Sequence, residues 1–544
     1  MDFKANQTDQ KLRGGYYTPL DLAEFMAKWV TKGDIKKILE PSSGDGNFFQ
    51  ALSRIVRDGE PEIKVTGVEL NKEEVEKSRE RIKTLNNIQF EILNEDYLEW
   101  GLKSQNNNSF DAVIGNPPFI RYQYLPKEYQ DRAEKIFDLY NLKFTKHTNA
   151  WVPFVVQSFE MLNPGGRLAM ILPSELMHVS HAQSLREYLG KNSEKILILD
   201  PKELWFEDTL QGALILFAEK KKSAKDKSRG LGIKEITNRS FADDDPHKYF
   251  KNINFINGET ITGKWTKAVL NKKELELIKE IKCSSEAYQF KEIADASVGI
   301  VTGANKYFLI NKKDAREFGI EDWSHPMFGR SEHCPKLVYD EDQHNRNIEK
   351  ELPTEFIWFD VDKFEELGED AQKYVKKGED KEYHKRYKCR IRDPWFKVPS
   401  VYATEIGMLK RSHNYHRLIL NEINAYTTDT AYRIKLKTDS IEPHQLVYNF
   451  LNSFTALTAE LEGRFYGGGV LELIPSEIKK TYVPIINSSY SDLKELDKKF
   501  NSLDPEEVLK QQDEHILKSF GLSKNDRNII HNAWQKLRDR RQRK

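Results

Sequence analysis

The stretch Leu-Glu-Pro-Ser-Ser-Gly-Asp-Gly-Asn-Phe, residues 39–48, joins the end of an apolar run to the start of a helical pattern. Glycines let a backbone approach a ligand closely, and the first turn of a helix carries N–H groups without partners. The dinucleotide fingerprint G-x-G-x-x-G fails here, because Phe49 stands where its third glycine would be. Glu40 would repel a pyrophosphate but attract a cation. The stretch therefore predicts a βα unit that binds a nucleotide-like ligand with positive charge.

Strand and helix patterns alternate on both sides of this unit. Alternation of this kind is typical of a doubly wound sheet, whose ligands bind beyond the carboxyl ends of its strands. We therefore predict a Rossmann-like, mostly parallel, seven-stranded α/β sheet with helices on both faces. The predicted strands are 35–40, 65–70, 89–93, 111–114, 167–172, 195–199 and 213–218, the predicted helices are 48–57, 73–85, 151–161 and 183–188, and residues 163–166 are a predicted turn.

The whole chain sets broader bounds. Its 544 residues predict two or three domains, and 85 basic against 85 acidic residues leave no net charge to indicate nucleic acid. Three cysteines without a CxxC pair argue against a zinc ribbon or a disulfide framework, and we expect no metal. No signal core and no apolar run of about 20 residues is present. We expect a cytoplasmic, multidomain protein.

Acidic residues follow two further predicted strands. Glu69 ends the second strand, 25 residues after Gly44, where a carboxylate commonly binds ribose hydroxyls. Asp96 follows the third strand and can accept a hydrogen bond from an adenine amino group, with the Tyr97 ring packing nearby. Ordinary solvated or capping acids are the alternative. Together with the glycine loop, these acids favour a ligand with ribose, adenine and positive charge, which describes S-adenosylmethionine.

Residues 110–119 read Phe-Asp-Ala-Val-Ile-Gly-Asn-Pro-Pro-Phe. Gly115 ends the predicted strand, and Asn116 is restricted to extended geometry because a proline follows it. Two prolines lack N–H donors, so the turn should present acceptors. Such a turn suits a planar amino group, with Phe119 offering a ring face beside it. The alternative is a turn that merely stops the strand.

In this order of motifs the chain resembles the gamma class of amino-methylating DNA methyltransferases. Gly15-Tyr16-Tyr17-Thr18-Pro19, "LEPSSGDGNF", "GVEL", Asp96-Tyr97, "NPPF" and "NPGGRLAMILPSEL" follow one another across residues 14–218. The resemblance implies an S-adenosylmethionine-dependent enzyme that methylates N6 of a flipped-out adenine at a specific site in double-stranded DNA, as the modification enzyme of a restriction-modification system. The cofactor-binding residues that it implies are Tyr17, Thr18, Pro19, Glu40, Pro41, Gly44, Asp45, Glu69, Leu70, Asp96, Tyr97, Asn116 and Pro118.

The resemblance also implies the roles of the catalytic residues. Asn116 and the Pro117 carbonyl would accept hydrogen bonds from the target amine, Pro118 would complete the turn, and Phe119 would stack on the base. Asparagine at position 116 favours adenine over cytosine N4. A second stacking aromatic is expected before the last strand; Trp205 and Phe206 both qualify, and we favour Phe206, while a core position for both is the alternative. The chain has no Pro-Cys dipeptide, which argues against C5-cytosine chemistry.

The composition changes after Ala218, and Lys220–Arg229 reads as a solvated linker. We place a methyltransferase catalytic domain at 1–240, a mixed α+β target-recognition domain at 241–485 and a helical, basic extension at 486–544. Residues 381–397 carry a net charge of +5 with interspersed aromatic rings. The DNA contacts expected there are Lys385, Arg386, Lys388, Arg390, Arg392 and Trp395. Residues 527–544 carry +6 and predict either phosphate contacts or a solvated, partly frayed helix.

Enzymes with other substrates could use the same Asn-Pro-Pro-Phe chemistry. Methyltransferases of ribosomal RNA or of protein glutamine are the alternative to a DNA enzyme, and a non-enzymatic DNA-binding protein is a weaker one. Only 13 residues precede Gly14, so we expect no nuclease domain ahead of the motifs. A separate restriction endonuclease acting on the same site is an expected partner. We further expect a monomer that works in a bacterial cytoplasm, on the nucleoid.

Overall fold

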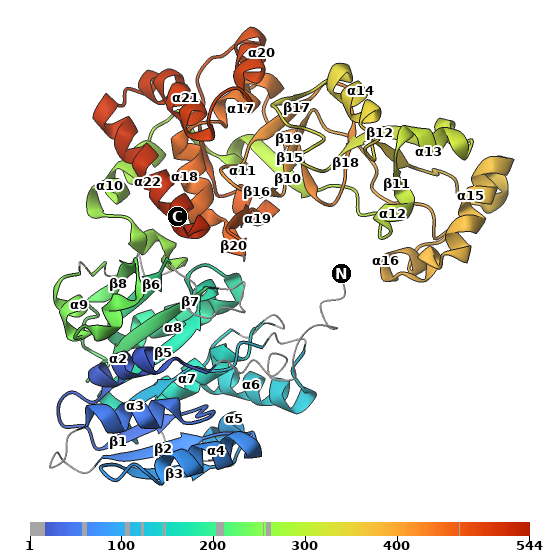
Figure 1. Cartoon of the computed structure of the whole chain (residues 1–544). Helices are drawn as coiled ribbons and strands as arrows, with labels where there is room; N and C mark the ends of the chain where they lie inside the picture. The colour runs from blue at the N-terminus through green and yellow to red at the C-terminus, as the bar shows by residue number, and fades with distance from the viewer. Residues whose placement is uncertain are drawn as a thin grey trace. The chain divides into compact units, whose positions relative to one another are not determined.

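The structure is a computed structural model, and it describes residues 17–543 except 57–62, 104–108, 121–123, 144, 146–147, 203–211, 254, 257–262 and 467 (Figure 1). The chain forms two compact units, residues 1–270 with the last two residues, and residues 271–542. The first unit therefore extends about 30 residues beyond the boundary predicted at 240. It does so because η4 (Arg239–Asp243) and η6 (Trp265–Val269) bury Phe241 and Trp265 in its core.

One large sheet organises the first unit, in the order β3-β2-β1-β4-β5-β7-β6-β8. Only the pairings of β7 with β5 and β6 are antiparallel, which confirms the mostly parallel α/β sheet. The strands within the described ranges are β1 (Lys37–Glu40), β2 (Lys64–Val68), β3 (Gln89–Leu93), β4 (Phe110–Gly115), β5 (Leu162–Pro173), β6 (Ser193–Pro201), β7 (Ala213–Lys220) and β8 (Gly230–Ile236).

Two points of the strand prediction are wrong. The sheet has an eighth strand, β8, which pairs in parallel with β6 directly after the predicted linker. Residues 163–166 are not a separate turn but lie in β5, where Gly165 takes a left-handed conformation with φ +80°. Both errors have the same cause. Glycine and lysine are uncommon in strands, so their presence argues against a strand in each segment, but pairing with a neighbouring strand outweighs that local preference.

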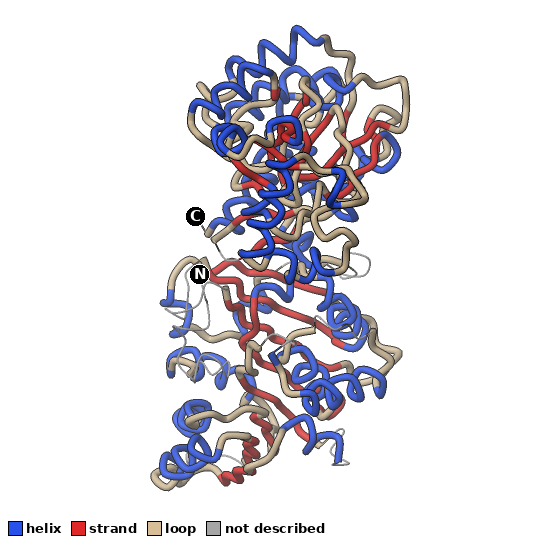
Figure 2. Tube along the Cα trace, turned by 90° about the vertical axis from the view of Figure 1, so that its right-hand side faces the viewer, coloured by secondary structure: helices blue, strands red, loops and turns tan. Residues whose placement is uncertain are grey.

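Helices cover both faces of the sheet, as Figure 2 shows for this unit. Successive strand residues belong to different cores: Ile38 packs with α2 and α3, whereas Leu39 packs with α5 to α8. This alternation confirms the doubly wound prediction, because it needs apolar cover on each face. The helices are α2 (Leu20–Val30), α3 (Asn47–Ile55), α4 (Lys72–Ile82), α5 (Tyr97–Lys103), α6 (Lys127–Leu139), α7 (Trp151–Glu160), α8 (Gln183–Asn192) and α9 (His247–Lys251).

The second unit mixes small sheets with helices. Its sheets have the orders β10-β19-β15-β17-β13, β11-β14-β12-β18, β16-β21-β20 and β22-β9. The strands are β9 (Ala287–Gln289), β10 (Ala294–Val298), β11 (Leu309–Ile310), β12 (Ser324–Phe328), β13 (Val338–Tyr339), β14 (Glu355–Ile357), β15 (Ile406–Leu409), β16 (Arg411–Ser412), β17 (Leu418–Asn421), β18 (Tyr426–Thr427), β19 (Ala431–Leu436), β20 (Arg464–Tyr466), β21 (Val470–Glu472) and β22 (Tyr482–Pro484).

Helices of this unit lie to either side of its central strands (Figure 1). They are α10 (Lys272–Lys282), α11 (Phe290–Ile293), α12 (Asn305–Phe308), α13 (Lys312–Glu317), α14 (Glu341–Glu349), α15 (Glu369–Asp380), α16 (Tyr387–Arg390), α17 (Pro443–Asn449), α18 (Ser453–Glu462), α19 (Pro475–Ile478), α20 (Tyr490–Lys499), α21 (Pro505–Ser519) and α22 (Lys524–Gln542). In the described part of the chain, no helix has the length and apolarity that crossing a membrane would require.

The C-terminal helix α22 is not a frayed, solvated element. It packs against α18 and α21 and buries Trp534 completely. Arg541 is also buried, and its guanidinium donates to the Glu460 carboxylate at 2.7 Å. Arg538 pairs with Glu506 at 2.6 Å. These arginines are therefore committed to internal ion pairs, which removes them as candidates for contacts with DNA phosphates.

Candidate active site

The strand order brings the predicted motifs together. Because β3, β2, β1 and β4 are adjacent and parallel, the segments after them lie side by side at one edge of the sheet. Glu40, Glu69, Asp96 and Asn116 stand at or just beyond these four strand ends. Ligands of doubly wound sheets bind at this edge.

The loop after β1 has a backbone that only glycines fit comfortably. Gly44 and Gly46 have φ of +52° and +85°, and Gly46 is the N-cap of α3. A Cβ at Gly46 would lie 3.1 Å from the Ser78 hydroxyl oxygen of α4. The Ser43 N–H donates to the Val68 carbonyl at 3.1 Å, which ties the loop to the end of β2. The loop is thus held in place on two sides before any ligand binds.

Glu40 is completely buried at the end of β1. Neither of its carboxylate oxygens has a hydrogen-bond partner among the residues that the structure describes, and the same holds for the Ser43 hydroxyl. Burial, followed by repulsion from Asp45 and Glu69, raises the pKa of Glu40 well above its ordinary value. An unpaired buried carboxylate is costly unless a cation approaches it. The site therefore fits a ligand with a positive group, such as the ammonium and sulfonium of S-adenosylmethionine.

Glu69 joins the β2 end to the glycine loop. Its carboxylate accepts from the Gly44 N–H at 2.9 Å and from the Asn71 N–H at 2.8 Å. Desolvation raises its pKa despite these bonds. The next residue, Leu70, is 66% exposed and is one of the most exposed large apolar side chains in the described structure. A carboxylate beside an exposed apolar face suits a ribose and a purine ring.

Asp96 and Tyr97 take different places. The Asp96 carboxylate caps α5 by accepting from the Glu99 N–H at 2.9 Å and also accepts from Arg132 of α6 at 3.0 Å. Tyr97, in contrast, is buried: its hydroxyl bonds Ser158 at 2.8 Å and its ring packs on Phe154. The expected ring contact with adenine is thus replaced by a core position, because α5 turns this side chain toward α7.

The Asp45 side chain forms an ion pair that helps to hold the glycine loop in place. Its carboxylate forms an ion pair with Arg81 of α4 at 2.8 Å, and Arg81 also donates to Gln50 of α3 at 3.1 Å. Desolvation outweighs the attraction of Arg81 and raises the pKa of Asp45. This network positions the start of α3 against α4. Sequence reasoning missed Arg81, because nothing in its own helix marks it as a partner of the loop.

The N-terminal motif lies against the same loop. The Asn47 amide donates to the Thr18 carbonyl at 3.0 Å, and Pro19 is the N-cap of α2. The Tyr17 hydroxyl donates to Glu74 of α4 at 2.9 Å. A Cβ at Gly44 would lie 3.9 Å from the Tyr17 ring, so this half-exposed ring borders the loop.

The Asn-Pro-Pro-Phe turn touches both preceding motifs. The Asn116 amide nitrogen donates to the Thr18 hydroxyl oxygen at 3.2 Å, and the Ser42 hydroxyl donates to the Asn116 carbonyl at 3.1 Å. A Cβ at Gly115 would lie 3.1 Å from the Pro41 ring. Glycine at 115 thus lets the end of β4 approach the β1 loop. Sequence reasoning did not single out Ser42, although its place in the small-residue loop is a usable signal.

The remaining catalytic candidates differ in exposure and packing. Pro117 is buried, and Pro118 is partly exposed. Phe119 is also partly exposed and packs against both cores of the unit. Trp205 and Phe206 lie outside the described residues.

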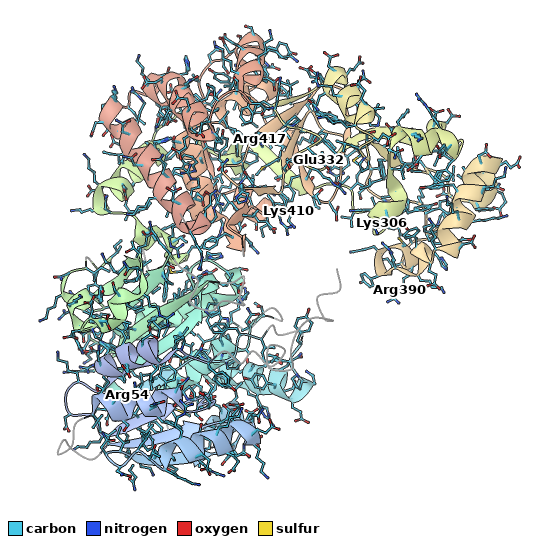
Figure 3. The ribbon with its side chains drawn as sticks, viewed as in Figure 1. Arg54, Lys306, Glu332, Arg390, Lys410 and Arg417 are labelled. Atoms are coloured by element: carbon cyan, nitrogen blue, oxygen red, sulfur yellow. The ribbon has the colours of Figure 1, made fainter. Side chains whose placement is uncertain are left out.

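The predicted DNA contacts of the second unit split into two groups. Lys385, Arg386, Lys388 and Arg390 are exposed on η9 (Tyr383–Lys385), α16 and the residue between them; Figure 3 labels Arg390. Arg392 instead donates to the carbonyls of Val301 and Thr302, at 2.6 and 2.8 Å. Trp395 packs on Tyr307 and donates to Glu379 at 3.0 Å. These last two side chains chiefly hold the segment in place.

Comparison with known proteins matches both units. Residues 3–296 match the family N-6 DNA Methylase, and residues 262–517 match the C-terminal domain of the type II methyltransferase M.Eco57I. The type II methyltransferase M.AccI of Acinetobacter calcoaceticus is 26% identical over 485 residues, which cover 86% of this chain and 84% of that protein. M.BanIII of Aneurinibacillus aneurinilyticus is 28% identical over 35% of this chain and 36% of its own length.

A solved structure is also similar. The type IIG restriction endonuclease BpuSI aligns over 97% of this chain and 66% of its own, with 14% identity and a TM-score of 0.44. The N-6 DNA Methylase match alone spans more than half of the 544 residues. The chain therefore belongs to the N-6 DNA Methylase family, as an S-adenosylmethionine-dependent, adenine-specific DNA methyltransferase.

Proposed function

We propose that the chain methylates N6 of an adenine flipped out of double-stranded DNA at a specific sequence, with Asn116 and Pro117 as the acceptors of the target amine. The observation that carries the proposal is the direct contact between the β1 loop and the Asn116 turn, through the Ser42 hydroxyl at 3.1 Å. A methyl donor held by the first and an amine held by the second would lie within reach of each other.

Methyl transfer to the adenine amine requires positioning of the two reactants and no covalent enzyme intermediate. An aromatic amine is a poor nucleophile, because its lone pair is delocalised into the ring. Hydrogen bonds from the amine to the Asn116 side-chain oxygen and the Pro117 carbonyl would localise that pair. S-adenosylmethionine supplies an electrophilic methyl group when bound. The Thr18 and Ser42 bonds to Asn116 fix the turn beforehand, so that little reorganisation is needed at the moment of transfer.

Each acidic residue at the sheet edge would bind a different part of the cofactor. Glu40 would face its positive groups, and Glu69 its ribose hydroxyls. Leu70 would cover one face of the adenine, and Asp96 would accept from the adenine amino group. Tyr17, Thr18, Pro19, Pro41, Gly44, Asp45 and Pro118 would shape the rest of the site, mostly through backbone and packing.

Base flipping adds a requirement for stacking. Extruding a base costs a few kcal/mol, and an aromatic face returns roughly 1–3 kcal/mol per base. Phe119 would supply one face, and Phe206, or else Trp205, the other. Methyltransferases of RNA or protein glutamine could use the same turn, but the family match to N-6 DNA methylases favours DNA.

The relatives point to a biological setting. Because M.AccI is a type II methyltransferase, we infer that this chain acts as a monomeric modification enzyme on cytoplasmic DNA, with a separate restriction endonuclease cutting the same sequence. Incubation with labelled S-adenosylmethionine and DNA, RNA or ribosomes tests the substrate class. Label confined to RNA or to ribosomal protein would contradict the proposal.

The exposed cations around α16 should contact DNA phosphates. Replacing Lys385, Arg386 and Lys388 with alanine is expected to weaken duplex binding and to flatten its salt dependence, since each phosphate contact contributes a slope of about 0.9. The measurement is fluorescence anisotropy on duplex DNA across a range of salt concentrations. A matched variant, Lys272→Ala with Lys273→Ala and Lys279→Ala on α10, removes three exposed lysines at the other end of the unit. Equal slopes for the two variants would exclude the α16 segment from the interface.

A further inference from the structure

A cavity of about 500 Å³ lies within the second unit, apart from the residues discussed for catalysis. It is bounded by the start of α12, by the segment after β12, by the β18–β19 turn and by η9. Its lining includes Lys306, Arg330, His333 and Lys381. Its size falls in the range of ordinary ligand sites.

The charge of this cavity is one-sided. Lys306, Arg330 and Lys381 line it, and no carboxylate residue does. Lys306 and Lys381 are exposed, and neither forms an ion pair with a carboxylate of the described residues. Arg330 has one, with Glu332 at 3.3 Å, where both side chains are more than half exposed. In a chain with no net charge, three cations around one cavity mark a local site for an anion.

His333 adds a buried donor to the wall of the cavity. Its side chain is 1% exposed, and its Nδ1 accepts from the Gly329 N–H at 3.4 Å. Burial lowers the pKa of His333 to about 4, so the ring is neutral at pH 7 and carries a single N–H. With Nδ1 as acceptor, that hydrogen is on Nε2, which has no hydrogen-bond partner in the described structure. A buried donor without a partner is costly. Nε2 is closed off from solvent, however, so the exposed cations, rather than His333, would contact an anion in the cavity.

The loop that leads into α12, at the edge of the cavity, packs against α16. A Cβ at Gly303, three residues before Lys306, would lie 2.6 Å from the Lys388 Cβ. The Cys389 thiol and the Arg392 guanidinium both donate to the Thr302 carbonyl. The loop before α12 is therefore clamped against α16. Figure 3 shows Lys306 and Arg390 on these neighbouring elements.

From this arrangement we infer that the cavity binds a phosphate group of the DNA backbone, with Lys306, Lys381 and Arg330 as the charges that contact it. The inference rests on the proposed function and deepens it, because it names a place where the second unit would bind the DNA backbone. A phosphate fits better than a base edge, since two of the three cations are lysines, which bind as point charges rather than through a planar bidentate fork.

Lys306→Ala tests this inference, because Lys306 is exposed and its loss leaves no partner behind. We expect the slope of log affinity against log salt for duplex DNA to fall by about 0.9, equally for every sequence tested. Lys306→Arg should restore the slope. The matched control is Lys524→Ala, an exposed lysine at the start of α22 on the other side of the unit.

An unchanged slope for Lys306→Ala would overturn the inference. So would a loss confined to one target sequence at constant slope, which would indicate a base edge in the cavity. Methyl transfer by the wild-type protein is measured in parallel. If the wild type methylates DNA but Lys306→Ala binds like Lys524→Ala, the inference alone fails; if the wild type methylates no DNA, the proposed function fails with it.

Discussion

Replacing Asn116 with alanine is expected to lower methyl transfer to DNA by about 10²–10³-fold, the range seen when one transition-state hydrogen bond is removed. The loss follows because the amine would keep only the Pro117 carbonyl as an acceptor, and its lone pair would stay delocalised. The measurement is the rate of label transfer from S-adenosylmethionine to DNA in a single turnover.

The same variant should still bind its cofactor. Asn116 contacts the site through Thr18 and Ser42, whereas Glu40 and Glu69 remain in place, so we expect an S-adenosylmethionine affinity within a few fold of wild type. Ser42→Ala is the matched control, since it removes a bond to the same turn but leaves the Asn116 amide. It should cost much less activity. Near-normal methylation by Asn116→Ala would exclude the proposed role of this residue.

Replacing Glu40 with glutamine is expected to stabilise the ligand-free protein at alkaline pH and to weaken cofactor binding. The carboxyl group has an ordinary pKa near 4.5, and burial raises it well above that value in the folded protein. The folded state therefore holds a proton that the unfolded chain has already released. Stability of the wild type falls as the pH rises from about 4.5 through the folded pKa, by about 1.4 kcal/mol for each unit of the shift.

Glu40→Gln lacks this titration. Its free energy of unfolding should equal or fall below that of wild type at pH 5 and exceed it at pH 8, as measured by denaturant unfolding without cofactor. Its S-adenosylmethionine affinity at pH 8 should fall by about 10–100-fold, because a charged hydrogen bond is worth about 1.5–3 kcal/mol. Glu80→Gln, at an exposed position of α4 that pairs with Lys83, is the control. A Glu40→Gln protein that binds the cofactor normally would contradict the role given to this carboxylate.

Much of the catalytic unit is predictable from the chain itself. Glu40, Glu69, Asp96 and Asn116 each follow a short apolar run, and parallel strands bring such positions to one edge. Strand order then decides which of them are neighbours, and the contact between the Ser42 and Asn116 segments needs the pairing of β1 with β4. Tyr97 shows the limit of prediction from sequence. It lies at the start of a helix, and the sequence there does not reveal whether its side chain faces the ligand or the core.

The second unit was harder to predict for a definite reason. Charge in a sequence window does not distinguish exposed from buried cations, and the partner of Arg541 is Glu460, 81 residues earlier. Ile530, Trp534 and Leu537 recur at helical spacing in the same tail, and this apolar face is what decides its packing. The cavity beside His333 likewise joins residues as far apart in the sequence as Asn305 and Thr430, 125 positions, a proximity that no local pattern predicts.

The proposed role of the Asn116 turn is adenine methylation of DNA. Its most direct test is to express the chain in bacteria lacking adenine methyltransferases and to sequence their DNA for modified bases. We expect N6-methyladenine confined to one recurring sequence, present with the wild-type chain and absent with Asn116→Ala. DNA without modified adenine under wild-type expression, or the same modification in the Asn116→Ala strain, would contradict it.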